Sequence, residues 1–152
     1  MEHVEKLLEQ SQGMSPASAK LKENLLEHYN AYMTNKEDLN SYPYAPTILC
    51  ISLIEKLDEN IVYNAIKQLD ELGCNVKSKD SDGINALMYA YLGGYASIIK
   101  YLEGKGMDPK EKSPVGCNAM MMAARGGHIN LIESCEKKAL ILPRKIIQGT
   151  PY

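Results

Sequence analysis

The chain has 152 residues, of which 45% are hydrophobic and 24% are charged, an ordinary composition for one soluble globular domain. Its net charge is −2 at pH 7 and its lysines and arginines are scattered, so neither nucleic acid nor an anionic membrane is an expected partner. No apolar run approaches the roughly 18 residues of a membrane span, and the charged N-terminus lacks the apolar core of a secretory signal.

The first part of the chain, residues 1–41, predicts an N-terminal helical cap made of two helices. Residues 2–10 carry apolar residues at helical spacing. A second helix is expected to begin at Pro16, with Ser15 as its N-cap, because proline favours the first helical position. Val4, Leu7 and Leu8 are expected on one face of the first helix, and the apolar stripe of the second helix is predicted to be core: Leu21, Leu25, Leu26, Tyr29, Tyr32 and Met33.

A proline-containing segment, Tyr42 to Pro46, is expected to separate this cap from the rest of the chain. Its two prolines lie close together, and proline within a helix removes a hydrogen bond and clashes with the preceding turn. The segment is therefore predicted to interrupt regular helix.

Two stretches of the chain repeat with a 33-residue period, which is the spacing of Gly83 and Gly116 (116 − 83 = 33). Each copy predicts a helix, a tight turn at two glycines, a second helix and a loop, and the helices of the middle copy are expected at 86–92 and 96–103. A period of this length is typical of a solenoid, which presents a surface rather than an active site. Six residues recur unchanged: Gly83, Asn85, Ala86, Ala90, Gly93 and Gly94 become Gly116, Asn118, Ala119, Ala123, Gly126 and Gly127.

A third, degenerate copy precedes these two. Gly73 lies one period before Gly106, whereas the segment that begins at Thr47 best matches the one that begins at Asn85, at a longer offset (85 − 47 = 38). The difference, 38 − 33 = 5, predicts about five extra residues around 55–60, in a loop, because insertions in repeat proteins map to loops. The three copies are predicted at residues 45–79, 80–112 and 113–138.

The C-terminal residues 139–152 depart from the repeat pattern. Ala139 stands where Gly73 and Gly106 end the second helices of the earlier copies. A terminal repeat normally has a polar outer face, whereas residues 140–143 are apolar and end in proline. We expect residues 139–152 either to fold back over the last copy or to be part of a longer protein.

The repeated residues resemble the ankyrin repeat family, whose pattern is roughly D-x-x-G-x-T-P-L-H-x-A-A-x-x-G-H, followed by an amphipathic helix and x-G-A-D-x-N. The resemblance covers residues 45–138, about three repeats, and implies an all-α solenoid of helix-turn-helix units behind the helical cap. The matching positions are Thr47, Leu49, Gly73 and Asn75 in the first copy; Asp80, Gly83, Leu87, Ala90, Gly94, Gly106 and Asp108 in the second; and Gly116, Ala123, Ala124, Gly127 and His128 in the third.

The chain departs from the family pattern at the start of each first helix. Asn85 and Asn118 replace the family's threonine, and the residue after each is alanine in place of proline. Met88 and Met121 replace the histidine that hydrogen-bonds between loops in the family. Asparagine can still cap the following helix, but without the histidine the loops are expected to be less rigid.

The resemblance implies a non-catalytic protein–protein interaction module, because ankyrin arrays hold partner proteins in a groove formed by loop tips and first helices. Four apolar residues fall at positions that face solvent in the fold, which indicates an interaction site or a surface covered by the chain's own ends. An arginine among them is a frequent hot-spot residue. The partner-binding residues implied are Ser81, Asp82, Ile84, Leu92 and Gly93 in the middle copy and Pro114, Val115, Cys117, Arg125 and Gly126 in the last.

Catalytic, cofactor and metal sites are not expected. The four cysteines form no C-x-x-C pair, which argues against zinc and redox chemistry and favours reduced thiols in a cytoplasmic compartment. His128 is expected to be structural at its turn, and the glycine-rich nucleotide-binding spacings are absent. Asp80, Asp82 and Asn85 resemble a calcium loop only superficially, because the twelfth position is Tyr91 rather than glutamate.

Three functions remain open at this point. The first is a protein-binding module, an effector or regulator, that acts in the cytosol, or in a host cytosol if the chain is secreted. The second is a targeting or regulatory domain of a larger multidomain enzyme, suggested by the apolar C-terminal residues. The third is a scaffold that self-associates through the apolar strip, although a monomer is favoured.

Overall fold

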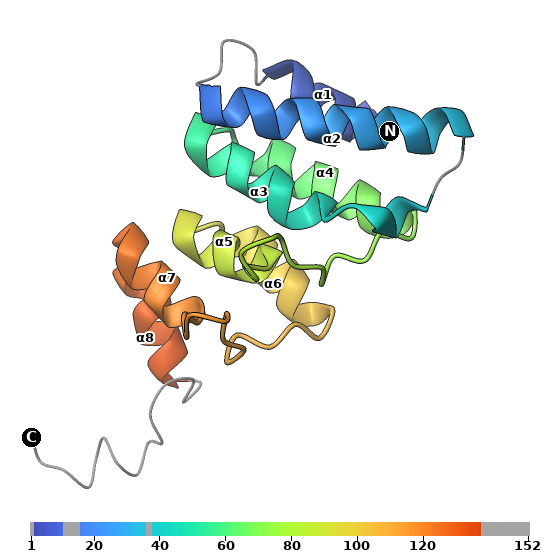
Figure 1. Cartoon of the computed structure of the whole chain (residues 1–152). Helices are drawn as coiled ribbons and strands as arrows, with labels where there is room; N and C mark the ends of the chain where they lie inside the picture. Colours follow the sequence, from blue (N-terminus) through green and yellow to red (C-terminus); the bar gives the residue numbers. More distant parts are fainter. Residues whose placement is uncertain (1, 11–15, 36–37, 138–152) are drawn as a thin grey trace, which may run out of the picture. The chain divides into compact units, whose positions relative to one another are not determined.

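The computed structural model describes residues 2–10, 16–35 and 38–137, and the regular structure in this part of the chain is helical (Figure 1). The all-α architecture predicted from the repeats is confirmed. Within the described residues, extended backbone pairs only in a single antiparallel bridge between Lys79 and Asn85. The chain divides into two compact units, residues 1–86 and 87–152. The predictions for residues 139–152 fall outside the described residues.

The first unit is a set of paired helices. The buried helix α3 packs against α2 and α4, and α4 also packs against α1. Two predictions are confirmed here, namely a helix over residues 2–10 and a second helix that begins at Pro16. The elements are α1 (Glu2–Gln10), α2 (Pro16–Asn35), a short 3-10 helix (Leu39–Ser41), α3 (Tyr44–Glu55) and α4 (Glu59–Glu71).

The apolar stripe predicted for the first two helices is only partly core. Its central residues are buried, whereas those at the margins of the stripe are half-buried and Met33 is exposed, because the stripe is wider than the contact of α2 with α3. Leu8 and Ser15 lie outside the described residues or side chains. The buried members are Val4, Leu7, Leu25 and Tyr29, and the half-buried ones are Leu21, Leu26 and Tyr32.

Helix α3 corrects the expectation drawn from the prolines. It begins at Tyr44, with Pro43 at its N-cap and Pro46 inside its first turn. The prediction that this segment interrupts regular helix holds for Tyr42 and Pro43 but is wrong for residues 44–46. The first backbone N–H groups of a helix have no intrahelical acceptor, so proline there loses no bond. Most residues of α3 are buried, which agrees with its being apolar on all sides.

The start of α1 is tied to α4 by one side chain. The Oε1 atom of Gln68, on α4, accepts hydrogen bonds from the backbone N–H groups of His3 and Val4 at 2.9 and 3.1 Å. Side-chain acceptors of this kind satisfy N–H groups that a helix leaves unpaired at its start. A polar residue of the first repeat therefore holds the N-terminal helix in place.

Replacing Gln68 with leucine is expected to destabilise the first unit by about 1 kcal/mol, because two N–H groups of α1 lose their acceptor. Gln68→Glu is the matched control, since its carboxylate can still accept both bonds. Amide hydrogen exchange of α1 should become faster in the leucine variant alone. Equal protection of α1 in the two variants would show that it docks independently of Gln68.

The described part of the second unit forms two helix pairs, and a hydrogen bond of Tyr91 joins the helices of the first pair. The helices are α5 (Ala86–Gly93), α6 (Ala96–Gly104), α7 (Ala119–Gly126) and α8 (Ile129–Lys137). The hydroxyl of Tyr91, a fully buried side chain of α5, donates to Oε2 of Glu103 on α6 at 2.6 Å. Helix α7 packs directly on α8. The helices predicted at 86–92 and 96–103 each extend one residue further than expected.

Most of the five extra residues of the first copy belong to helix α4, and the loop between α3 and α4 is hardly longer than its equivalent between α5 and α6. Two residues connect α5 to α6, and three residues, 56–58, connect α3 to α4. At the 33-residue offset the first residue of α6, Ala96, corresponds to Tyr63, yet α4 begins at Glu59, four residues earlier (63 − 59 = 4). The prediction that the insertion forms a loop is therefore wrong, because four of its five residues add about one helical turn to α4.

Candidate interaction surface

The loop before α5 is a tight turn held by one aspartate. The Gly83 N–H donates to the carbonyl oxygen of Asp80 at 3.0 Å, and the Asp80 N–H donates to the carbonyl oxygen of Ile84 at 3.0 Å. The Asp80 carboxylate accepts from the N–H groups of Asp82 and Ile84 at 2.9 and 3.0 Å. These bonds leave Ser81 and Asp82 at the tip of the turn, where both are exposed.

The loop before α7 repeats this geometry one period later with a different side chain. The Gly116 N–H donates to the carbonyl oxygen of Ser113 at 2.8 Å, and the Ser113 N–H donates to the carbonyl oxygen of Cys117 at 2.7 Å. The Ser113 hydroxyl accepts from the Cys117 N–H at 3.1 Å. The exposed tip of this turn consists of Pro114 and Val115.

The asparagine that replaces the family's threonine caps its helix as predicted. Asn118 is the N-cap of α7, and its Oδ1 accepts from the N–H of Met121 at 3.0 Å. Asn118 is itself buried. The loop and the first turn of α7 are therefore joined by a side-chain bond, which restrains the turn even though the loop histidine of the family is missing.

The predicted binding residues occupy equivalent positions in two copies, and they differ in exposure. Four polar or small residues, Ser81, Asp82, Pro114 and Arg125, are exposed. Of the four apolar residues, Val115 is 81% exposed, whereas Ile84, Leu92 and Cys117 are half-buried. The expectation of a fully solvent-facing apolar strip is therefore corrected, because the turn bonds fold Ile84 and Cys117 back toward their helices.

These residues fall into two groups. Ser81, Asp82 and Ile84 share the turn at the end of the first unit, and the remaining seven, Gly93 and Gly126 included, belong to the second unit. In the second unit, Pro114, Val115 and Cys117 lie on one turn, and Arg125 lies near the end of α7. The sequence analysis missed that the side chains of Asp80 and Ser113 accept backbone hydrogen bonds and so close these two turns. The D-x-x-G and S-x-x-G patterns could have indicated turns of this kind.

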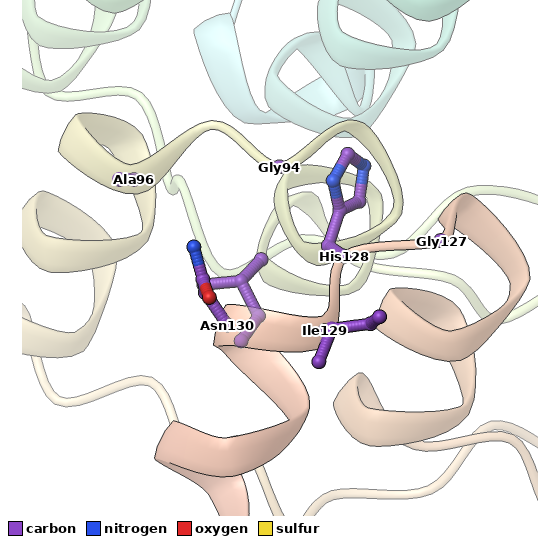
Figure 2. A pocket seen from close by; sticks show the side chains of 7 residues that line it. Gly94, Ala96, Gly127, His128, Ile129 and Asn130 are labelled. Atoms are coloured by element: carbon purple, nitrogen blue, oxygen red, sulfur yellow. The ribbon is translucent and has the colours of Figure 1, made fainter.

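A pocket lies between the turn after α5 and the start of α8. Its volume is about 400 Å³, and its lining comes from Gly94, Ala96, Gly127, His128, Ile129, Asn130 and Leu131. Figure 2 shows the His128 ring turned toward Gly94, with Asn130 and Ile129 projecting from α8 below it. The Nε2 atom of His128 lies 2.9 Å from the carbonyl oxygen of Leu92. Because a carbonyl oxygen only accepts, Nε2 carries the proton.

The glycines around His128 have a second purpose besides turning the chain. Gly94 has φ +70°, a conformation that side chains disfavour, and a Cβ there would lie 2.5 Å from Cε1 of His128. A Cβ on Gly126 would overlap the backbone carbonyl oxygen of Leu92. The two copies thus approach each other with bare backbone at Gly94 and Gly126, where glycine is needed for space, whereas Gly127 has open space around it and is needed only for its φ of +77°.

The described residues contain no cluster of three or more His, Cys, Asp or Glu side chains that could hold a metal ion. The carboxylate of Asp80, which fell in the calcium-like pattern, instead accepts bonds from the backbone of its own turn. Among the described residues, no helix is long and apolar enough to cross a membrane.

Cys74 is expected to be the least reactive of the described cysteines. Burial, with a smaller contribution from the nearby charge of Asp70, raises the pKa of its thiol to about 11. The thiolate fraction at pH 7 is then about 100-fold lower than for a thiol of pKa 9, and the side chain is also buried. Mass spectrometry after brief alkylation should show Cys117, which is half-buried, modified before Cys74. Modification in the opposite order would contradict this placement.

The comparisons with known proteins agree with the geometry. A family model described as ankyrin repeats, in three copies, matches residues 54–134, just over half of the chain. No curated protein matches the chain.

Proposed function

The chain belongs to the ankyrin repeat family, and on this premise we propose that it binds a partner protein through its exposed turns, above all the turn before α7, together with Arg125 in the last turn of that helix. Ankyrin repeats are generally protein-interaction modules and are typically non-catalytic. A binding role therefore follows from the family, and the choice of surface rests on the exposure of particular residues.

The observation that carries the proposal is the turn at Pro114 and Val115. A valine that is 81% exposed gains apolar burial when a partner covers it. Two backbone hydrogen bonds and the Ser113 hydroxyl hold this turn in one conformation. Binding a partner therefore costs little conformational entropy at the turn. Arg125, exposed on α7, adds a side chain that often dominates binding energy at interfaces.

The turn at Ser81 and Asp82 offers a different chemistry. Lys77 and Lys79 are exposed on one side of it, and Asp82 is exposed at its tip. This surface is mixed in charge, and it suits a partner that offers hydrogen bonds and a charge pair more than one that offers an apolar patch. We propose that this turn by itself favours partners of that polar kind.

We place this function in a reducing cytosol, and in a host cytosol if the protein acts as an effector. The support is that Cys74 and Cys117 are both thiols in the structure, and extracellular domains of this size commonly use cysteine in disulfides. The compartment is a proposal that fractionation of cells expressing the tagged chain would test.

The binding surface is tested by proximity capture in cells with the native chain and a Val115→Asp, Arg125→Glu double variant. Ile129→Asp is the matched control, because Ile129 is also a largely exposed apolar residue of the last copy (66%) but is the first residue of α8 and no part of the turn before α7. We expect one set of proteins to be lost with the double variant and retained with the control. Loss with Ile129→Asp, or retention by all three proteins, would reject the proposed surface.

A further inference from the structure

Helix α1 packs on α4 through one narrow apolar face. Of its described side chains, Val4 and Leu7 are fully buried. These two residues are three positions apart, so they project from the same side of the helix. The other described side chains of α1 are exposed, namely His3, Glu5, Lys6 and Glu9.

The two hydrogen bonds that Gln68 of α4 makes to α1 are bonds to its backbone. The Oε1 atom accepts from the N–H groups of His3 and Val4 at 2.9 and 3.1 Å. Every α-helix has unpaired N–H groups of this kind at its start, so these bonds do not depend on which side chains α1 carries. Helix α4 therefore provides an acceptor that suits any helix that begins at the same place.

A helix as short as α1 depends on this packing for its structure. It has nine residues, whereas isolated helices shorter than about 12–15 residues are marginal in water. Segments that few buried side chains hold in place open at a low free-energy cost compared with the core of a domain. When α1 leaves α4, the surface that covered Val4 and Leu7 becomes accessible together with the Gln68 acceptor.

We propose that the face of α4 that α1 covers, which includes Gln68, is a binding site for an amphipathic helix of a partner protein, and that α1 competes with that helix. The partner helix has two apolar side chains spaced as Val4 and Leu7 are, polar side chains elsewhere, and a start that Gln68 can cap. Its apparent affinity is reduced to the extent that α1 occupies the site. The site lies in the first unit and the turn before α7 in the second, so this proposal does not depend on the one above.

Two neighbouring residues supply a matched pair of variants. Leu7 is buried and Lys6 is exposed. Leu7→Asp places a charge in the apolar contact and should release α1, whereas Lys6→Asp places the same charge in solvent and should leave α1 docked. Amide exchange should accordingly be faster in α1 of the Leu7→Asp chain alone. Native protection of α3 in both variants shows that the rest of the first unit stays folded.

The probe is a fluorescently labelled peptide with the sequence of residues 2–10, because α1 is a helix that the structure shows to fit this face. Its binding to the full chain is followed by fluorescence anisotropy. We expect the peptide to bind the Leu7→Asp chain several-fold more tightly than the native chain or the Lys6→Asp chain. In the Leu7→Asp chain, a second change of Gln68→Leu should weaken peptide binding several-fold, and Gln68→Glu should not.

Equal binding of the peptide to the Leu7→Asp and native chains overturns the proposal. A peptide that itself carries Leu7→Asp is the control for non-specific association, and equally tight binding of this control overturns the proposal as well. If Leu7→Asp lowers the protection of α3, the milder Leu7→Ala chain is compared with Lys6→Ala in the same way, and the same two outcomes decide.

Discussion

Replacing Gly126 with alanine is expected to destabilise the second unit by about 3 kcal/mol or more. The added methyl group would overlap the backbone carbonyl oxygen of Leu92 and press against the His128 ring. A flexible side chain could rotate away from such a clash, but a backbone carbonyl can move only with its helix. The change therefore forces the α5 end and the α7 end apart and breaks the bond from His128 Nε2 to Leu92.

Alanine substitutions at two further glycines separate the steric clash of the added methyl group from the change in helix propensity. Gly104, at the end of α6, has no atom from outside its own stretch of helix within 4 Å of the position of an added Cβ, so Gly104→Ala should leave stability within about 1 kcal/mol of native. Gly94→Ala meets the His128 ring and also has an unfavourable φ of +70°, so it should destabilise by more than about 1 kcal/mol.

Thermal unfolding followed by circular dichroism, with amide exchange to locate the change, measures all three variants. The expected pattern is a near-native midpoint for Gly104→Ala and clearly lower midpoints for the other two. If Gly126→Ala unfolds at the native temperature, the close approach between the two copies is wrong. A rescue of Gly94→Ala by His128→Ala would show that the ring is the group the methyl meets.

Replacing Ile48 with alanine is expected to destabilise the first unit by about 2–5 kcal/mol. Ile48 is fully buried on α3, the helix that packs against both α2 and α4. Removing three carbon atoms there leaves a cavity that the surrounding helices cannot fill without moving. The loss combines the transfer free energy of the removed atoms with the free energy of the cavity.

The control for this prediction lies on the same helix. Ile54 is 42% exposed, so Ile54→Ala removes the same atoms from a position that water already reaches. Its expected effect is below about 1 kcal/mol. Urea unfolding of both variants, monitored by circular dichroism, should separate them clearly. Equal destabilisation would mean that Ile54 is covered in solution.

The helices of the middle copy were predictable because glycine and the repeat period fix their limits. Gly93 and Gly94 lie at the turn between α5 and α6, and the structure places the helix ends within one residue of the prediction. Pro16 likewise begins α2 as predicted. Local chemistry decides these points, since the conformational preferences of glycine and proline act on the residues beside them.

Three features were not predictable from single residues. Proline at positions 43 and 46 suggested a break, yet α3 begins there. The inserted residues suggested a loop, yet they lengthen α4. Ile84, Leu92 and Cys117 were expected to face solvent, yet each is half-buried. The prolines are tolerated because they stand at the start of α3, and hydrogen bonds within the turns fold Ile84 and Cys117 back toward their helices.

The sequence by itself determined the repeat, the family and the order of the helices, because periodic apolar residues and glycines act over a few turns of chain. The tertiary structure decided how much of each side chain is exposed, which glycines lack space for a methyl group, and that Gln68 holds α1. These properties depend on atoms that are distant in sequence: Gly126 is constrained by Leu92, and His3 by Gln68. No pattern of neighbouring residues contains that information, since it arises only when the helices pack.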